Sequence, residues 1–327
     1  MSLCACSHCT LLHPAHPDAS IFVKLLICML NVVLTPVLLI YHSFNSYVVP
    51  CFLSTARCFA VSCCRSCSCC ESWLTYSDSS FKPDNSSLGN VQCQATGVRW
   101  IRIPDLLVKT DKHSRPVLFD ETIEGTDVCQ GALGDCWLLA AFATLCERKT
   151  FIQNIFVTQT YNPFGKYTVR LYNPVKKQFF NVTIDDYVPC DSHGRPLFCK
   201  FNGHEMWPLL LEKAYAKSKG SYAAIEGGRP LNAMIELTGY QGEAMVGPFS
   251  DAQFTKMKHC IDKGCLLAAG SHGVDNTLRT GRAGLKSSIA AGHAYSVLKI
   301  KTPHLTTKKL RLLKIRNPWL VLCALCA

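Results

Sequence analysis

The chain has 327 residues, of which 48% are hydrophobic and 17% are charged. This length can bury one large core or two modest ones, and the hydrophobic content excludes a disordered, collagen-like or low-complexity chain. The formal net charge is +11 at pH 7, but the basic residues are scattered, and no zinc-finger, helix-turn-helix or aromatic-stacking motif accompanies them. We therefore interpret the positive charge as a solvated surface and expect no nucleic-acid partner.

The first 94 residues differ from the rest in charge and in cysteine content. Basic and acidic residues balance there, so the whole net charge lies in 95–327, and 12 of the 21 cysteines precede residue 95. Small secreted domains use disulfides because they lack a core, whereas the longer segment has enough apolar residues to build one. We expect a cysteine-rich leader over 1–94 and an intracellular, cytoplasmic domain over 95–327.

An uncharged apolar run of 17 residues covers 25–41. This length is at the short end for a membrane-spanning helix, so the run is a marginal transmembrane candidate and predicts membrane association of the leader. A cleaved signal peptide fits poorly because Asp18 and Lys24 precede the run.

A cluster of cysteines over 51–70 contains CxxC spacing from Cys64 to Cys67 and from Cys67 to Cys70. A zinc ribbon needs a second pair further on, and none follows in this segment. Palmitoylated cysteines that strengthen the anchor are one alternative, and a leader without a fold is another.

Residues 74–95 are rich in Ser, Pro, Asn and Gly, which predicts a linker and a domain boundary.

After residue 95 the hydrophobic pattern is that of a globular α+β protein. Residues 135–147 are apolar around most of the helix circumference, which predicts a helix buried inside the domain. Further helices are predicted over 206–217 and 254–262. Strands are predicted over 167–172, 178–184, 266–270, 293–301 and 310–316.

Cys136 begins the buried helix, directly after a turn over 131–134. Backbone N–H groups and the positive end of the helix dipole favour a thiolate there, and the thiolate is the nucleophilic form. Gln130 lies six residues upstream and could donate to an oxyanion together with the Cys136 N–H. Asp135 is placed to cap the same helix. Because most thiols without a disulfide partner are core residues, the position of Cys136 alone favours simple packing.

A nucleophilic cysteine needs a base, and the base needs a group that orients its ring. His293 begins one predicted strand, and Asn317 follows the end of the next. Two adjacent antiparallel strands can present these side chains at neighbouring ends. The chain order Cys136, His293, Asn317 and its separations resemble the papain-type arrangement.

Four segments, at 126–140, 207–217, 292–297 and 316–319, together resemble the calpain family of calcium-dependent cysteine proteases. The resemblance implies a papain-like fold of two lobes with a cleft between them, a helical lobe over 95–245 and a β-rich lobe over 246–327. It implies Cys136 as nucleophile, His293 as base, Asn317 as its orienting partner and Gln130 in the oxyanion hole. The implied activity is limited proteolysis of protein substrates through an acyl-enzyme.

The resemblance also implies a Ca²⁺ site in the first lobe, with Asp127 and Glu205 as ligands. Both are hard oxygen donors of the kind that Ca²⁺ prefers. For Glu205 the alternative is a carboxylate that interacts with the dipole of the following helix. No EF-hand loop is present in the sequence.

The chain departs from the family pattern after Trp319, where an apolar stretch over 320–327 follows. Compared with the family, this departure implies that a second Ca²⁺ site is absent, that the second lobe loses edge strands, and that an apolar tail is exposed. Two functional hypotheses follow: a calcium-dependent endopeptidase, or a catalytically impaired calpain-like scaffold or regulator. The sequence leaves open whether a regulatory subunit exists.

Overall fold

The computed structural model describes residues 75–91, 97–110, 115–273, 289–302, 304–305, 308–319 and 323–326. The candidate transmembrane run and the cysteine cluster of the leader lie outside these residues. Within the described ranges no helix combines the length and hydropathy needed to cross a bilayer. Residues 75–327 form one compact unit.

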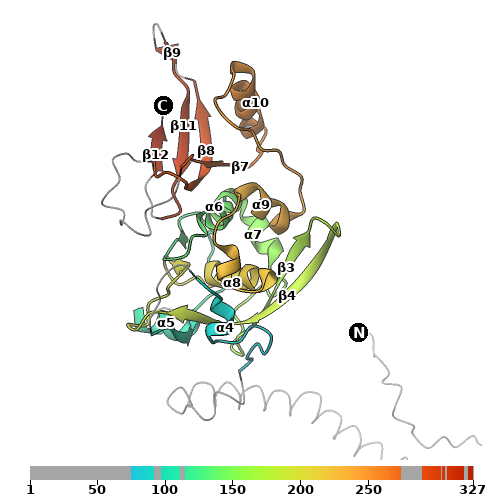
Figure 1. The fold of residues 1–327 in the computed structure, drawn as a ribbon, viewed down its shortest axis with the longest axis vertical. Helices are drawn as coiled ribbons and strands as arrows, with labels where there is room; N and C mark the ends of the chain where they lie inside the picture. The colour runs from blue at the N-terminus through green and yellow to red at the C-terminus, as the bar shows by residue number, and fades with distance from the viewer. Residues whose placement is uncertain are drawn as a thin grey trace, which may run out of the picture. The chain divides into compact units, whose positions relative to one another are not determined.

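The fold combines seven described helices with short antiparallel sheets, which confirms the α+β class (Figure 1). The helices are α4 (Asn85–Leu88), α5 (Ile103–Thr110), α6 (Cys136–Leu145), α7 (Lys149–Ile155), α8 (Trp207–Lys219), α9 (Pro230–Thr238) and α10 (Asp251–Asp262), with 3₁₀ turns η3 (Cys146–Arg148) and η4 (Ala223–Ile225). The strands of the first part are β1 (Arg99–Arg102), β2 (Val128–Cys129), β3 (Lys166–Asn173), β4 (Gln178–Asp185), β5 (Tyr187–Cys190) and β6 (Lys200–Phe201). They pair as β1 with β5, β2 with β6 and β3 with β4. The later strands are β7 (Leu267–Gly270), β8 (Ala294–Lys301), β9 (His304–Leu305), β10 (Lys308–Lys309), β11 (Leu312–Arg316) and β12 (Cys323–Cys326).

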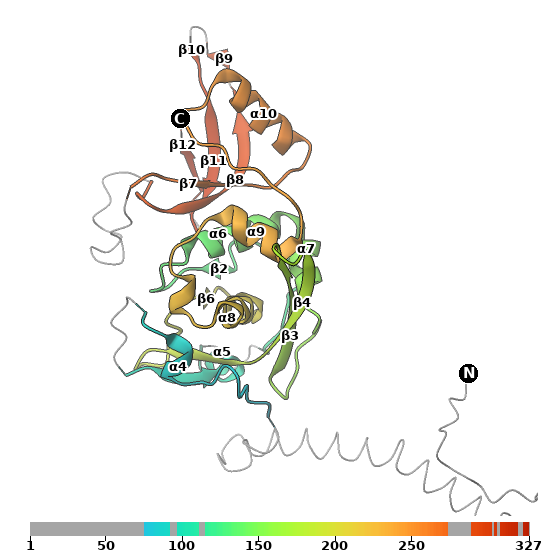
Figure 2. The ribbon, with the colours of Figure 1, turned by 45° about the vertical axis from the view of Figure 1, so that its right-hand side comes forward.

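Helix α6 lies in the larger of two hydrophobic clusters, and all ten of its residues are buried. This confirms the buried helix predicted from the apolar circumference of residues 135–147. Helix α8 is seen end-on in Figure 2, surrounded by the β3–β4 hairpin, α6 and α9. Its residues from Trp207 to Ala216 are buried, including Glu212 and Lys213. The charged residues of α8 therefore need partners inside the protein.

The smaller cluster lies between α10 and a four-stranded sheet with the order β12-β11-β8-β7. Side chains alternate along β8: Tyr295 and Val297 pack with α10, whereas Ser296 contacts α6 on the opposite face. Val297 pairs with Ile315 and Lys299 with Lys314, so β8 has one extra residue at this point. Such a bulge shifts the alternation by one residue, which places Ile300 in the same cluster as Val297.

One strand of the four-stranded sheet, β12, follows Trp319. Residues 323–326 add to the sheet as its edge strand, antiparallel to β11. Strand β12 satisfies backbone groups of β11 that would otherwise face solvent.

Residues 75–91 are not the linker that their composition predicts. Phe81 and Leu88 are buried in the larger cluster, and Asp84 caps α4 by accepting from Ser86 N. The Asp78 backbone N–H donates to Asp185 Oδ2 at 2.7 Å, and Lys217 Nζ donates to Asp78 Oδ2 at 2.5 Å. This segment is therefore part of the folded domain.

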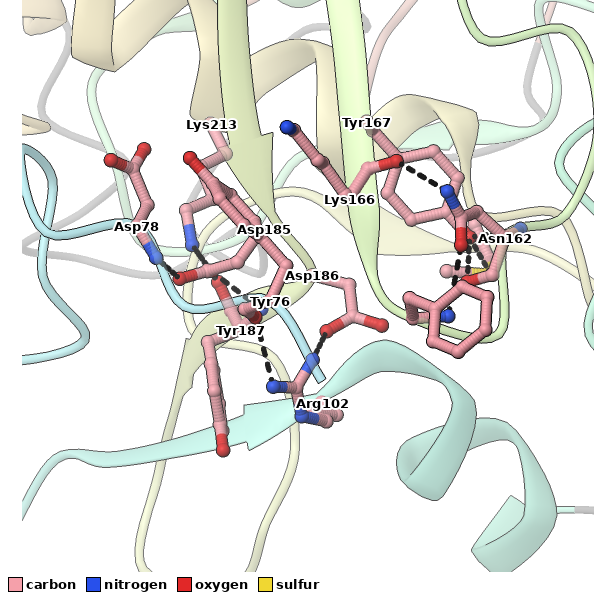
Figure 3. Close-up of polar contacts among 12 residues, drawn as sticks. Tyr76, Asp78, Arg102, Asn162, Lys166, Tyr167, Asp185, Asp186, Tyr187 and Lys213 are labelled. Carbon is pink, nitrogen blue, oxygen red and sulfur yellow. Dashed lines mark hydrogen bonds and ion pairs between the residues drawn. The ribbon is translucent and has the colours of Figure 1, made fainter. Parts of the chain in front are cut away.

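Hydrogen bonds join this segment to two buried ion pairs in the body of the domain (Figure 3). Lys213 of α8 pairs with Asp185, and both side chains are fully buried. Arg102 pairs with Asp186 and also donates to the Tyr76 carbonyl at 3.0 Å. Because each of these charged side chains has a partner of opposite charge, burying it costs less free energy.

Candidate active site

Cys136 occupies the first position of α6. The Asp135 carbonyl accepts from Leu138 N and Leu139 N at 2.9 and 3.1 Å, which begins the helix. The Cys136 side chain is 8% exposed. The thiol therefore lies at the positive end of the α6 dipole, where a thiolate is stabilised.

The prediction that the Asp135 side chain caps α6 is wrong. Asp135 occupies the N-cap position, but its carboxyl group makes no cap hydrogen bond. The side chain is fully buried and turned toward Glu212 of α8. The Asp135 carboxyl group therefore contacts Glu212 of α8 instead of the backbone N–H groups at the start of α6.

Gln130 is buried beside the start of α6. Its side-chain Nε2 donates to the Leu133 carbonyl at 2.8 Å, and its backbone N–H donates to the Pro318 carbonyl at 2.9 Å. Cys129 donates from Sγ to the Trp319 carbonyl at 3.4 Å. These bonds hold the segment before Cys136 against the segment that follows β11.

His293 and Asn317 lie together at neighbouring ends of β8 and β11. The distance from His293 Nε2 to Asn317 Oδ1 is 2.9 Å. Because Asn317 Oδ1 also accepts from Trp319 N at 3.0 Å, this atom is the amide oxygen and Nε2 is the nitrogen that donates. In the neutral ring Nδ1 is then the basic nitrogen.

Further contacts fix the plane of the imidazole. The Trp319 ring lies over it with ring centroids 3.9 Å apart, and Tyr295 meets it edge-on at 5.0 Å. Ser271 Oγ accepts from the His293 backbone N–H at 3.0 Å and donates to the Ala290 carbonyl. Sequence reasoning missed Ser271, because nothing in the pattern near the end of β7 distinguishes it from a loop serine.

The sheet that carries His293 and Asn317 packs on the helix that carries Cys136. Ser296 of β8 donates to the Ala140 carbonyl at 3.1 Å. Arg316, next to Asn317, donates to Glu147 at 2.8 Å and to the Ala143 carbonyl at 3.3 Å. A Cβ atom at Gly125 would lie 1.9 Å from Arg316 Nη1, so only glycine lets the guanidinium reach this place. Cys136, His293 and Asn317 thus belong to elements in direct contact.

Asp127 and Glu205, the predicted Ca²⁺ ligands, lie next to each other with their carboxyl groups hydrogen-bonded. Asp127 Oδ2 accepts from Glu124 N at 2.6 Å, and Glu205 Oε1 accepts from Asp120 N at 2.7 Å. Burial and then the Asp127 carboxyl raise the pKa of Glu205 to about 8. A buried and a partly buried carboxyl group that repel each other when ionised fit a cation. No group of three or more His, Cys, Asp or Glu side chains gathers at metal distance anywhere in the described ranges.

A model of a family described as calpain family cysteine protease matches residues 76–321. The chain is 36% identical over 260 residues to the calpain-type cysteine protease ADL1 of Oryza sativa subsp. japonica, and 38% identical over 262 residues to the calpain-type cysteine protease DEK1 of Arabidopsis thaliana. Each match covers 75% of this chain and 11% of the relative.

Animal proteins match as well. The chain is 31% identical over 266 residues to the calpain-1 catalytic subunit of Rattus norvegicus, a match that covers 77% of this chain and 35% of that protein. The chain therefore spans about a third or less of the length of these curated relatives.

Proposed function

Because this chain belongs to the calpain family of cysteine proteases, we propose that it cleaves peptide bonds in protein substrates, with Cys136 as the nucleophile. The observation that carries the proposal is the hydrogen bond of 2.9 Å between His293 and Asn317, on a sheet that packs against the helix beginning at Cys136. A nucleophile at a helix start and a base oriented by a third group are the parts that acyl transfer requires.

In the proposed reaction His293 Nδ1 takes the thiol proton and the Cys136 sulfur attacks the scissile carbonyl. The negative oxygen that forms is stabilised by the Cys136 backbone N–H and by Gln130. The tetrahedral intermediate then breaks its C–N bond, and His293 gives the proton to the leaving amine, which leaves a thioester on Cys136. Water attacks the thioester with His293 as base and releases the acid product and the thiol. Asn317 keeps the imidazole in the required tautomer throughout.

We also propose that the fold is papain-like, with the two hydrophobic clusters as the centres of two lobes and the cleft between them. The larger cluster contains Cys136, whereas the smaller one lies in the sheet that leads to His293 and Asn317. Closing the lobes would bring the thiol and the imidazole into reacting distance, and regulation by Ca²⁺ would act on this step.

Asp127 and Glu205 would hold Ca²⁺ in the first lobe. When bound, the ion would neutralise the two adjacent carboxylates and stabilise the chain on either side of them. We expect the double variant Asp127→Ala/Glu205→Ala to lose the heat of Ca²⁺ binding that the parent shows in titration calorimetry. The matched control is Glu121→Ala, an exposed acid in the same region, which should leave the heat unchanged. Equal heats for the double variant and the parent would remove this site from the proposal.

The proposed function is tested by labelling the full chain with an epoxide that alkylates cysteine proteases, with and without Ca²⁺. We expect the label on Cys136, located by mass spectrometry, and faster labelling with Ca²⁺. A folded sample that is not labelled under either condition would contradict the endopeptidase and favour the scaffold or regulator.

A further inference from the structure

Two carboxyl groups meet in the core directly behind Cys136. Asp135 precedes the nucleophile in the chain, and Glu212 comes from the middle of α8. Asp135 is fully buried and Glu212 is 2% exposed. We call these two side chains the carboxyl pair.

The contacts of the carboxyl pair require a proton. Glu212 Oε1 accepts from Cys199 N at 2.7 Å, and the Glu212 and Asp135 side chains hydrogen-bond to each other. Two ionised carboxylates can only accept, so a hydrogen bond between the Glu212 and Asp135 side chains needs a proton on one of them. One carboxyl group must therefore be protonated for the pair to be satisfied.

The surroundings of the pair also favour retention of that proton. The titratable groups that face it are Glu226, Tyr222 and the Cys199 thiol, none of which supplies a positive charge. Burial raises the pKa of Asp135 to about 7 and the pKa of Glu212 well above its usual range. Burial also raises the pKa of Tyr222 and of Cys199, so these neighbours stay neutral. As the pH rises Asp135 ionises first and Glu212 keeps its proton, so the pair then carries one proton and one negative charge.

We propose that Asp135 and Glu212 are positioning residues that share one proton, and that loss of this proton to solvent at alkaline pH makes the Cys136 thiolate less stable. The inference rests on the proposed function, in which Cys136 is the nucleophile. A second negative charge in the buried pair, one residue from the thiol, opposes the charge on sulfur. It also breaks the hydrogen bond that joins the start of α6 to α8.

Each amide variant replaces one carboxyl group by a neutral donor that cannot lose a proton at any pH. In Glu212→Gln the new Nε2 can donate to Asp135 while Oε1 still accepts from Cys199 N. In the second variant, Asp135→Asn, the new Nδ2 can donate to the Glu212 carboxylate. The matched control is Glu236→Gln in α9, a partly buried carboxylate that accepts from Tyr215 Oη at 2.6 Å, outside the pair.

The measurement is the rate of Cys136 alkylation by iodoacetamide in the full chain as a function of pH, followed on the Cys136 peptide by mass spectrometry. We expect the midpoint of the profile to fall by about one pH unit in both amide variants, and to move by less than about 0.2 unit in the control. A midpoint that is unchanged in both amide variants overturns the inference.

Thermal unfolding gives a second measure. A carboxyl group whose pKa is higher in the folded than in the unfolded state stabilises the fold at low pH, and the stabilisation decreases as pH rises toward the folded pKa. The parent should therefore lose stability between about pH 4 and pH 7, and both amide variants should lose less. A merely structural role would shift the unfolding temperature equally at all pH values.

The outcomes separate the inference from the proposed function. Alkylation needs only the thiol, so a shifted profile without casein cleavage would reject the protease and keep the pair. Casein cleavage together with an unshifted pH profile would support the protease and reject the role of the carboxyl pair. Failure of both amide variants to fold at about pH 6 would also overturn the inference, because the amides supply the bonds that it requires.

Discussion

Replacing Cys136 with alanine should lower kcat/KM for casein cleavage by at least about a thousandfold, since no other group on the first turn of α6 can form the acyl-enzyme. The side chain is small and lies at the edge of the core, so we expect the variant to fold. The measurement is release of soluble peptides from casein with Ca²⁺ present, together with the thermal unfolding temperature.

The control for Cys136 is Cys265→Ala, which removes an exposed thiol beyond the C-terminal end of α10. Its casein activity should equal that of the parent. If Cys136→Ala cleaves casein at the parent's rate, the assignment of the nucleophile is wrong, whatever the labelling experiment gives.

The second large effect concerns stability. We expect Asp185→Asn to lower the free energy of unfolding by about 3–5 kcal/mol, because it leaves the fully buried ammonium group of Lys213 without its carboxylate. Asp185 also accepts from Asp78 N at 2.7 Å and from Tyr187 N at 3.0 Å. Urea unfolding near neutral pH measures the change.

An exposed ion pair provides the matched comparison. Lys256 pairs with Glu243 at 2.5 Å, with both side chains more than half exposed. Glu243→Gln should therefore change the free energy of unfolding by no more than about 0.5 kcal/mol. If Asp185→Asn costs no more than this control, the buried network does not stabilise the domain.

The sequence predicts the long elements well. The apolar circumference of residues 135–147 identifies α6, and alternation or runs of β-branched and aromatic residues identify β3, β4, β8 and β11. The adjacency of His293 and Asn317 follows from antiparallel pairing of the last two strands predicted before residue 317. The catalytic roles of these residues stay predictions until they are measured.

Contacts between distant residues could not be predicted. Serine and asparagine in 75–91 predict turns correctly, but the partners that make this segment part of the core lie more than a hundred residues away. Asp135 is a similar case: its position suits a helix cap, and only the tertiary fold brings Glu212 to it. The sequence offered one indication of this contact. Glu212 is a charged residue among the apolar residues of α8, and a buried charged residue needs a partner.

The long-range contacts of residues 75–91 also affect how the chain folds during synthesis. Asp78 and its partner Lys217 are separated by 139 residues. At about 5–20 residues per second, roughly 7–28 s pass between their emergence from the ribosome. During that interval Phe81 lacks the Tyr222 ring that it contacts in the folded domain, so the nascent chain exposes apolar surface that chaperones recognise. Slowing translation before α8 would lengthen this exposure and favour aggregation of the nascent protein.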